Sequence, residues 1–304
     1  MVFALNDQEL QTLLEMLKSL LLGGNLLLFV TAALVFVAPL KRQPDASPVQ
    51  TKRALVVTAH PDDESMFFLP LVHSLQDGTS SGKDMWETHL LCLSRGDFDG
   101  LGTVREQELR ACAVHIGLVP DHVHVLDEPE LQDGIENRWD VSRIAAIVLQ
   151  YVDQKSIDAV FTFDGHGVSG HPNHIATHLG VQRALRERQE TCRAAAATTN
   201  ASEEKVVRGW ALESTNLVRK YIGILDTVLS LWLSRQREET QEERQVVVVC
   251  RPWWNYKAMA LHRSQFVWYR RLFVVFSRYT FVNTFRPLLE VDAPDLPVEY
   301  KKTR

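Results

Sequence analysis

The sequence predicts an α/β protein with a mostly parallel sheet and helices on both faces. Short runs of β-branched and apolar residues alternate with amphipathic helical patterns, which is typical of successive βαβ units. The predicted strands are residues 54–59, 87–94, 122–126, 158–163, 207–214 and 245–250, and the predicted helices are residues 64–76, 103–117, 138–153, 171–189, 217–233 and 253–265. Ligands of such sheets bind at the carboxyl ends of the strands, so we expect the functional residues there.

The composition is that of a globular protein. The chain has 304 residues, of which 45% are hydrophobic and 23% are charged, and it is long enough to bury a core without disulfides or structural metals. Its cysteines are far apart, which argues against a disulfide scaffold and favours a reducing compartment. The formal net charge of −5 offers no basic surface for phosphates, so we expect no nucleic-acid partner.

The N-terminal region differs from the rest of the chain. Residues 19–40 are apolar and uncharged, and as a helix they would cross a bilayer core of ~30 Å. We predict a transmembrane helix there, with residues 1–18 as a tail and residues 41–53 as a linker. The catalytic domain is then expected at 54–290, followed by a C-terminal tail at 291–304.

The apolar segment has two other interpretations. A cleaved signal peptide would carry basic residues before a shorter apolar region, whereas Asp7, Glu9 and Glu15 precede this one. A buried soluble helix is disfavoured by the Pro-containing linker that follows. The basic residues after the segment place the body on the cytosolic side by the positive-inside rule. They are Lys41, Arg42, Lys52 and Arg53.

The first functional motif directly follows the strand at 54–59. It reads His60-Pro61-Asp62-Asp63-Glu64. Helix capping would explain one or two of these carboxylates, because Asp, Glu and Pro are favoured in a first helical turn. Capping leaves the histidine unexplained, and a bound metal ion accounts for the cluster better.

The second motif follows the strand at 158–163. His171, His174 and His178 are spaced so that they share one face of a helix, and we predict that His178, furthest into the helix, is a packing residue. The preceding glycines match the dinucleotide fingerprint G-x-G-x-x-G only formally. We interpret them as hinges that allow a metal-binding loop to approach closely.

Together the motifs offer two imidazoles and a carboxylate, with coordination positions left open. This is the pattern of a catalytic zinc site, but the same set also binds Fe(II) in oxygenases, so ligand type alone leaves the metal open. A spare carboxylate beside the ligands favours hydrolysis, since the attacking water needs a base.

The strand ending in AHPDDE, followed later by GHPNH, resembles the PIG-L/LmbE family of zinc-dependent de-N-acetylases. The resemblance covers roughly residues 54–288 and includes LSRGDFDGLGTVREQEL and LESTNLVRKYIGILD, which look like its eukaryotic branch. It implies a Rossmann-like (LmbE-like) fold and a zinc cofactor, with other divalent metals as alternatives. It also implies N-acetylglucosaminyl-phosphatidylinositol, a membrane glycolipid, as the substrate, deacetylated in the second step of GPI-anchor synthesis. The expected location is the endoplasmic reticulum membrane, with a single span and a cytosolic catalytic domain.

The resemblance also implies roles for individual residues. The zinc ligands would be His60, Asp63 and His174. Asp62 matches the general base that takes a proton from the attacking water, and His171 matches the general acid. Asp62 as a further ligand is the alternative.

Two substrate contacts are implied less directly. Arg105 and His262 resemble residues that bind substrate in the family. The respective alternatives are a surface ion pair of Arg105 with Glu108 or a neighbour, and a packed histidine at His262. The sequence departs from some relatives at Asn173, where an aspartate can orient the acid, and at Ser169, where an aromatic can stand. The protonation tuning of His171 is therefore left open.

Other functions were considered beside a glycolipid deacetylase. They are a de-N-acetylase of a soluble N-acetylglucosamine conjugate, a non-catalytic metal-binding membrane scaffold and an iron oxygenase. Residues 266–288 mix aromatic residues with arginines, a composition typical of a segment lying at a membrane interface. A packed amphipathic helix is the alternative interpretation of this segment.

Overall fold

The computed structural model describes most of the body of the chain. Continuous description covers residues 51–77, 85–134, 136–198, 206–238 and 244–289, with single residues nearer the N terminus. The predicted transmembrane helix lies outside these stretches, as do the predicted tails, and those predictions are untested. Among the described residues, no helix has the length and apolar character needed to cross a membrane.

The described residues form one sheet of seven strands in the order β3-β2-β1-β4-β5-β7-β6. The strands are β1 (Thr51–Thr58), β2 (Met85–Cys92), β3 (Val123–Val125), β4 (Ala159–Phe163), β5 (Arg208–Leu212), β6 (Gln245–Val248) and β7 (Val282–Pro287). The first five run parallel to one another. β7 is antiparallel to both of its neighbours, β5 and β6. The predicted mostly parallel sheet is confirmed.

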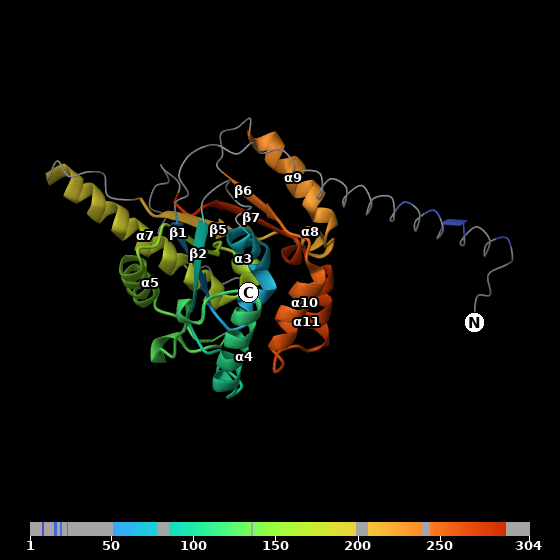
Figure 1. The fold of residues 1–304 in the computed structure, drawn as a ribbon, viewed down its shortest axis with the longest axis horizontal. Coiled ribbons are helices and arrows are strands. Elements are labelled where there is room, and N and C mark those ends of the chain that lie inside the picture. The colour runs from blue at the N-terminus through green and yellow to red at the C-terminus, as the bar shows by residue number, and fades with distance from the viewer. Residues whose placement is uncertain are drawn as a thin grey trace.

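Helices pack on both sides of this sheet, as predicted. They are α2 (Asp63–Phe67), α3 (Leu69–Gln76), α4 (Gly102–His115), α5 (Val141–Lys155), α6 (Gly167–Gly170), α7 (Pro172–Thr198), α8 (Leu217–Tyr221), α9 (Leu225–Glu238), α10 (Pro252–Leu261) and α11 (Trp268–Phe276). Figure 1 shows α5 and α7 on one side of the molecule and α10 and α11 on the other. Short 3-10 turns lie at Pro120–His122, Pro129–Leu131 and Arg278–Thr280.

The central strands form the core because both of their faces are covered. Leu55 and Val57 on β1 and Val160 on β4 are fully buried, as expected of parallel strands between two helical layers. Aromatic packing joins the parallel and antiparallel parts, since the rings of Phe161 and Phe285 lie edge to face at 5.3 Å. All four cysteines are free.

The prediction for residues 266–288 is wrong in its second half. This half is neither an interfacial segment nor a helix, because β7 inserts between β5 and β6 as an interior strand. Its pairing partners are distant in sequence, so nothing local indicated the strand. The first half of the segment is α11.

Beside β7 lies a buried polar network built on Asp226 of α9. Its carboxylate accepts hydrogen bonds from Arg219, Arg278 and Ser230. Asp226 and Arg278 are completely buried, and Arg278 also reaches Ser230 and Thr284. Every oxygen of this carboxylate therefore has a partner.

The strand order places the two sequence motifs together. β1 lies between β2 and β4. From β1 the chain adds β2 and β3 on one side, and it then returns to add β4 and β5 on the other side. Such a switch point opens a crevice at the carboxyl ends of the two strands. The first motif follows β1 and the second follows β4.

Candidate active site

The loop after β1 is fixed by the side chain of Asp63. Its Oδ2 accepts hydrogen bonds from the backbone N–H groups of Ala59 (2.9 Å) and His60 (2.8 Å). The residue between them and the helix, Asp62, has a φ of 112°, a conformation that costs an L-residue free energy and is common at functional sites. The loop therefore holds the side chains of His60, Asp62 and Asp63 in one fixed arrangement.

The loop after β4 is fixed in the same way by Asp164. Its Oδ1 accepts from the backbone N–H groups of His166 and Gly167, both at 3.0 Å. Gly167 has a φ of 59°, and a Cβ there would lie 2.9 Å from the Cβ of His174. Val168, a β-branched residue, also has a positive φ of 63°. The predicted role of the glycines as close-approach hinges is confirmed at Gly167.

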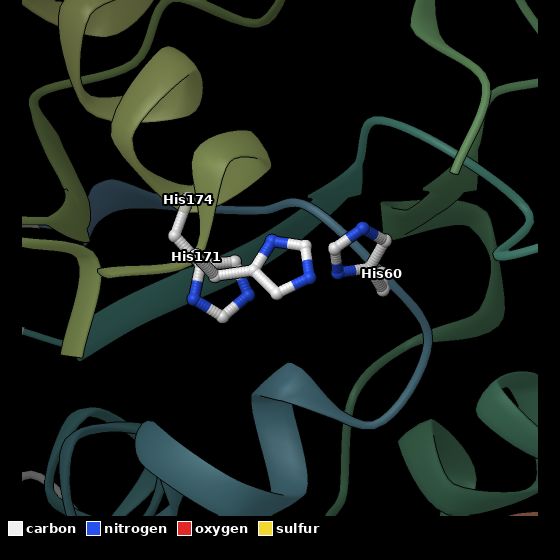
Figure 2. A group of neighbouring side chains, drawn as sticks. All are labelled: His60, His171 and His174. Atoms are coloured by element: carbon white, nitrogen blue, oxygen red, sulfur yellow. The ribbon is translucent and has the colours of Figure 1, made fainter. Parts of the chain in front are cut away.

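Three histidines from the two motifs meet at the sheet edge. His60 comes from the loop after β1, whereas His171 and His174 come from the start of α7, and the three rings lie side by side (Figure 2). Ring centroids are 4.9 Å apart for His60 and His171 and 4.8 Å apart for His171 and His174. One nitrogen from each ring lies within 4.8 Å of the others. This spacing is close enough for a shared metal ion.

The contact between His174 and Asp63 fits a cation between them. His174 Nδ1 lies 3.1 Å from the Gly167 carbonyl oxygen and donates a proton to it. In the neutral ring Nε2 then carries a lone pair, yet it lies 3.1 Å from Asp63 Oδ1. A lone pair facing a carboxylate oxygen requires a proton or a metal between them. Burial opposes charge on both groups, but their contact raises the pKa of His174 and lowers that of Asp63.

The remaining ligand candidate, His60, is held from the other side. Its Nε2 lies 3.1 Å from Asp133 Oδ1 and 2.9 Å from the side-chain amide of Asn173. The Asn173 Oδ1 atom is buried without a partner in the assigned orientation. Rotating the amide by half a turn would let that oxygen accept from His60 Nε2, since oxygen and nitrogen positions of an amide are assigned from hydrogen bonding. His60 Nδ1, 3.9 Å from Asp63 Oδ2, would then be free to bind a cation.

Asp62 lies beside the histidines in a different environment. Its carboxylate forms an ion pair with Arg270 of α11 and lies 4.0 Å from Arg105. Burial raises the pKa of Asp62 above its ordinary value, and the negative charge of Asp63 adds to the rise, while the two arginines act against it. Two adjacent carboxylates are thus driven in opposite directions, Asp62 toward proton binding and Asp63 away from it.

His171 is the least constrained of the three histidines. Its Nδ1 accepts a hydrogen bond from the backbone N–H of Asn173 at 3.3 Å, so in the neutral ring the proton is on Nε2. Burial and the neighbouring His174 and His60 lower the pKa of His171 to about 4. His171 is therefore a neutral donor.

Comparisons with known proteins agree with this site. Residues 55–185 match the family described as PIG-L: GlcNAc-PI de-N-acetylase. An N-acetylglucosaminyl-phosphatidylinositol de-N-acetylase from Bos taurus is 36% identical over 242 residues, covering 76% of this chain and 82% of the relative. A probable enzyme of the same name from Dictyostelium discoideum is 34% identical over 258 residues, covering 81% of this chain and 96% of the relative. The chain belongs to the PIG-L family.

Solved structures show the same fold at much lower identity. An N,N'-diacetylchitobiose deacetylase from Pyrococcus horikoshii superposes with a TM-score of 0.50 at 17% identity, covering 78% of this chain and 83% of that one. A triple mutant of a deacetylase from teicoplanin biosynthesis gives a TM-score of 0.51 at 15% identity, covering 78% and 97%. The predicted LmbE-like architecture of this PIG-L protein is thereby supported at the level of fold.

Arg105, predicted to bind substrate, forms part of the wall of the site in this PIG-L chain. Its guanidinium donates to the carbonyl oxygens of Gly96 (2.6 Å) and Pro61 (3.1 Å) and to Asp133 (3.2 Å). Of the alternative, an ion pair with Glu108 or a neighbour, the Glu108 part is wrong, because Glu108 accepts instead from the backbone and side chain of Ser264. The ion pair that Arg105 does form, with Asp133, is largely buried and not on the surface.

His262, also predicted to bind substrate, lies behind the first motif. Its Nε2 is 2.6 Å from Glu64 Oε1, and both side chains are completely buried. The other oxygen of Glu64 accepts from the backbone N–H of Asp62 at 3.1 Å. His262 thus supports the strained loop through Glu64, and substrate contact by His262 stays a prediction. His178 donates to the Phe163 carbonyl oxygen at 2.9 Å, as expected of a packing residue.

Two residues of the site were not found from the sequence. Asp133, in the loop after β3, contacts His60, and Arg270, on α11, contacts Asp62. Asp133 follows a predicted strand at the sheet edge where ligands bind, so its position was a usable signal. Nothing in the local sequence around Arg270 indicated that it faces the catalytic loop.

Proposed function

We propose that this protein hydrolyses the N-acetyl group of N-acetylglucosaminyl-phosphatidylinositol to give glucosaminyl-phosphatidylinositol and acetate, the second step of GPI-anchor synthesis. The observation that carries the proposal is the meeting of both sequence motifs at one sheet edge in a chain of the PIG-L family. The names of the relatives supply the substrate class.

His60, Asp63 and His174 would hold a zinc ion, with other divalent metals as alternatives. When bound, zinc would lower the pKa of a water molecule to about 7 and polarise the acetyl carbonyl. The donor set supports this assignment, since a lone pair of His174 faces a carboxylate oxygen of Asp63.

Asp62 is the general base of this proposal. Unlike Asp63, whose carboxylate accepts from two backbone N–H groups, Asp62 accepts a hydrogen bond from the side chain of Arg270 within the described residues. Burial makes it bind a proton more readily than an exposed aspartate. Asp62 takes a proton from the attacking water as the new C–O bond forms.

His171 is the general acid. Its Nε2–H donates a hydrogen bond to the carbonyl oxygen as negative charge develops there, which is the role of an oxyanion donor. When the C–N bond breaks, the amine nitrogen takes the Nε2 proton while the imidazole regains a proton from the Asp62 carboxyl. The proton taken from water thus ends on the amine, and both side chains return to their starting states. The fixed tautomer, set by the Asn173 N–H, makes Nε2 the donor atom.

The proposed location rests on the proposed substrate and on the N-terminal sequence. We place the protein in the endoplasmic reticulum membrane as a single-pass protein with a cytosolic catalytic domain. The support is the uncharged segment at residues 19–40 and the basic residues after it, together with a substrate that carries its acyl chains in a bilayer.

The test is conversion of radiolabelled N-acetylglucosaminyl-phosphatidylinositol by membranes containing the full chain. We expect labelled glucosaminyl-phosphatidylinositol from the unaltered protein, lost with a chelator and with Asp62→Asn, but kept with Asp121→Asn, a matched change at an exposed carboxylate. Activity only on a soluble N-acetylglucosamine conjugate would contradict the glycolipid substrate and indicate a soluble one. Equal activity in Asp62→Asn would remove the assigned base.

A further inference from the structure

The C-terminal helices present an apolar surface to solvent. The exposed apolar residues of α11 and its N-cap are Val267, Trp268, Tyr269, Leu272, Val275 and Phe276, and those of α8 are Leu217, Val218 and Tyr221. We call this set the α8–α11 surface. Trp268 is 72% exposed, and contiguous apolar patches of this kind mark sites of protein or membrane contact.

The two helices adjoin one another. The rings of Tyr221 on α8 and Phe273 on α11 pack edge to face at 6.1 Å, and α8 and α11 lie on the same side of the molecule (Figure 1). Phe273 and Val274 face the core, while Leu272, Val275 and Phe276 face outward. Helix α11 therefore exposes several apolar side chains beside Arg271, although an ordinary surface helix is mostly polar on its outer side.

The stretch of sequence that contains α11 carries basic residues and no acidic ones. From residue 245 to residue 289 the sequence contains no Asp or Glu. The basic residues of this stretch are Arg251, Lys257, Arg263, Arg270, Arg271, Arg278 and Arg286. Arg271 is exposed and lies over the ring of Phe266, with its Cζ 5.0 Å from the ring centroid. Lys257, Arg263 and Arg271 are exposed, whereas Arg270 and Arg278 are paired with Asp62 and Asp226. Exposed Trp and Tyr beside exposed basic residues are complementary to an anionic lipid surface.

The surface is linked to the catalytic centre through α11 itself. Arg270 forms an ion pair with Asp62 and donates to Gln265 at 2.9 Å, whereas Leu272, two residues later, faces outward. The thickness of one helix, about 10 Å, thus separates the catalytic loop from the outer surface.

We propose that the α8–α11 surface docks onto an anionic lipid bilayer and holds the catalytic centre at the headgroup layer. This inference rests on the proposed function, because a lipid-linked sugar substrate would lie at the headgroup layer. The ligand class is anionic phospholipid, bound by interfacial burial of Trp268, Leu272 and Phe276 and by attraction to Arg271.

The first test measures where α11 lies, independently of activity. The full chain carries an environment-sensitive fluorophore at Leu272→Cys or at Val206→Cys, with Cys192 and Cys250 replaced by serine, in phosphatidylserine–phosphatidylcholine vesicles. Val206 is 73% exposed and lies just before β5. It therefore lies near the amino-terminal end of that strand, whereas the site lies at the carboxyl ends of the strands. Lipids with a quencher on the acyl chain should quench most of the fluorescence at residue 272 and leave residue 206 unchanged.

Three outcomes would overturn the docking proposal. They are equal quenching at the two positions, no quenching at residue 272, or energy transfer between residue 272 labels on two chains without lipid quenching, which would indicate a second copy on this surface. Undiminished quenching in phosphatidylcholine alone would contradict the requirement for anionic lipid.

The second test compares Leu272→Glu with the matched Val206→Glu. The rate on vesicle-borne substrate should fall about tenfold in Leu272→Glu and not in Val206→Glu, while both hydrolyse the acyl-free headgroup at the unaltered rate. Equal loss on both substrates would indicate a structural effect and count against docking. Absence of deacetylation by the unaltered protein, with quenching at residue 272 intact, would sink the proposed function and leave docking in place.

Discussion

Buried charge occurs at two places in this molecule, and the two are built differently. Beside β7, the carboxylate of Asp226 receives hydrogen bonds from Arg219, Arg278 and Ser230, so each of its oxygens is paired. At the sheet edge between β1 and β4, Asp62 and Asp63 are adjacent carboxylates, and Asp62 has a positive φ.

The difference distinguishes a structural charge from a functional one. A fully paired buried carboxylate contributes to the specific packing of the fold, and removal of one partner is costly. Adjacent carboxylates whose pKa values are driven apart, in a loop with a positive φ, are the arrangement typical of a functional site. We therefore expect substitutions at the β1–β4 edge to affect turnover and substitutions at Asp226 to affect stability.

The largest effect is expected for His171→Gln. The amide cannot supply a transferable proton to the leaving amine, so kcat should fall by about 10²–10⁴, while the melting temperature stays close to that of the unaltered protein. Turnover of the glycolipid and thermal unfolding, measured on the same preparation, check this. A variant that keeps its activity would remove His171 as the acid.

Next in size is Asp226→Asn. The change leaves the buried Arg278 guanidinium without its counter-charge, which should lower the free energy of unfolding by about 3–5 kcal/mol. Activity per folded molecule should stay the same, as measured by urea unfolding with turnover below the transition. The control is Asp121→Asn, at an exposed position. A specific loss of kcat with normal stability would reverse the comparison.

Arg270→Met sharpens the comparison because Arg270 joins the C-terminal region to the catalytic loop. Loss of the ion pair leaves Asp62 less well oriented, and we expect kcat/KM on an acyl-free substrate to fall about tenfold. Arg271→Met is the matched control, since the neighbouring side chain is exposed and does not reach the site. Equal rates in the two variants would show that Arg270 does not position Asp62.

The smallest effect is expected for Gly96→Ala. Gly96 has a φ of 68°, and a Cβ there would lie 2.5 Å from Arg105 Cζ, so alanine would displace the guanidinium and lower turnover about threefold. Gly100→Ala carries the same backbone strain, with a φ of 72°, but its Cβ would meet nothing within 4 Å. Both should lose about 1 kcal/mol of stability, and only Gly96→Ala should lose activity.

The sequence predicted the features that depend on local motifs and missed those that depend on contacts between distant segments. The motif after β1 and the motif after β4 were predictable because each is local, and the alternation of strands and helices brought their ends together. Contacts between distant segments were not predictable. Arg270 meets Asp62 across 208 positions, and β7 was missed because its hydrogen bonds go to β5 and β6.

The boundaries of the helices were also decided by packing. The helix predicted at 64–76 is divided at Phe68 into α2 and α3, with Phe68 completely buried. The helix predicted to end at residue 189 continues to Thr198. Helical propensity alone determines neither point, because tertiary contacts contribute more than propensity in a folded protein.

The most direct test of the account is metal content measured on the purified full chain, side by side for Asp62→Asn and Asp63→Asn. Asp63 is the proposed ligand and Asp62 the proposed base, although the two side chains are adjacent and chemically identical. These roles predict one zinc per chain in the unaltered protein and in Asp62→Asn, and a large loss of zinc in Asp63→Asn, with both variants inactive. Loss of zinc in Asp62→Asn with retention in Asp63→Asn would contradict the assigned roles.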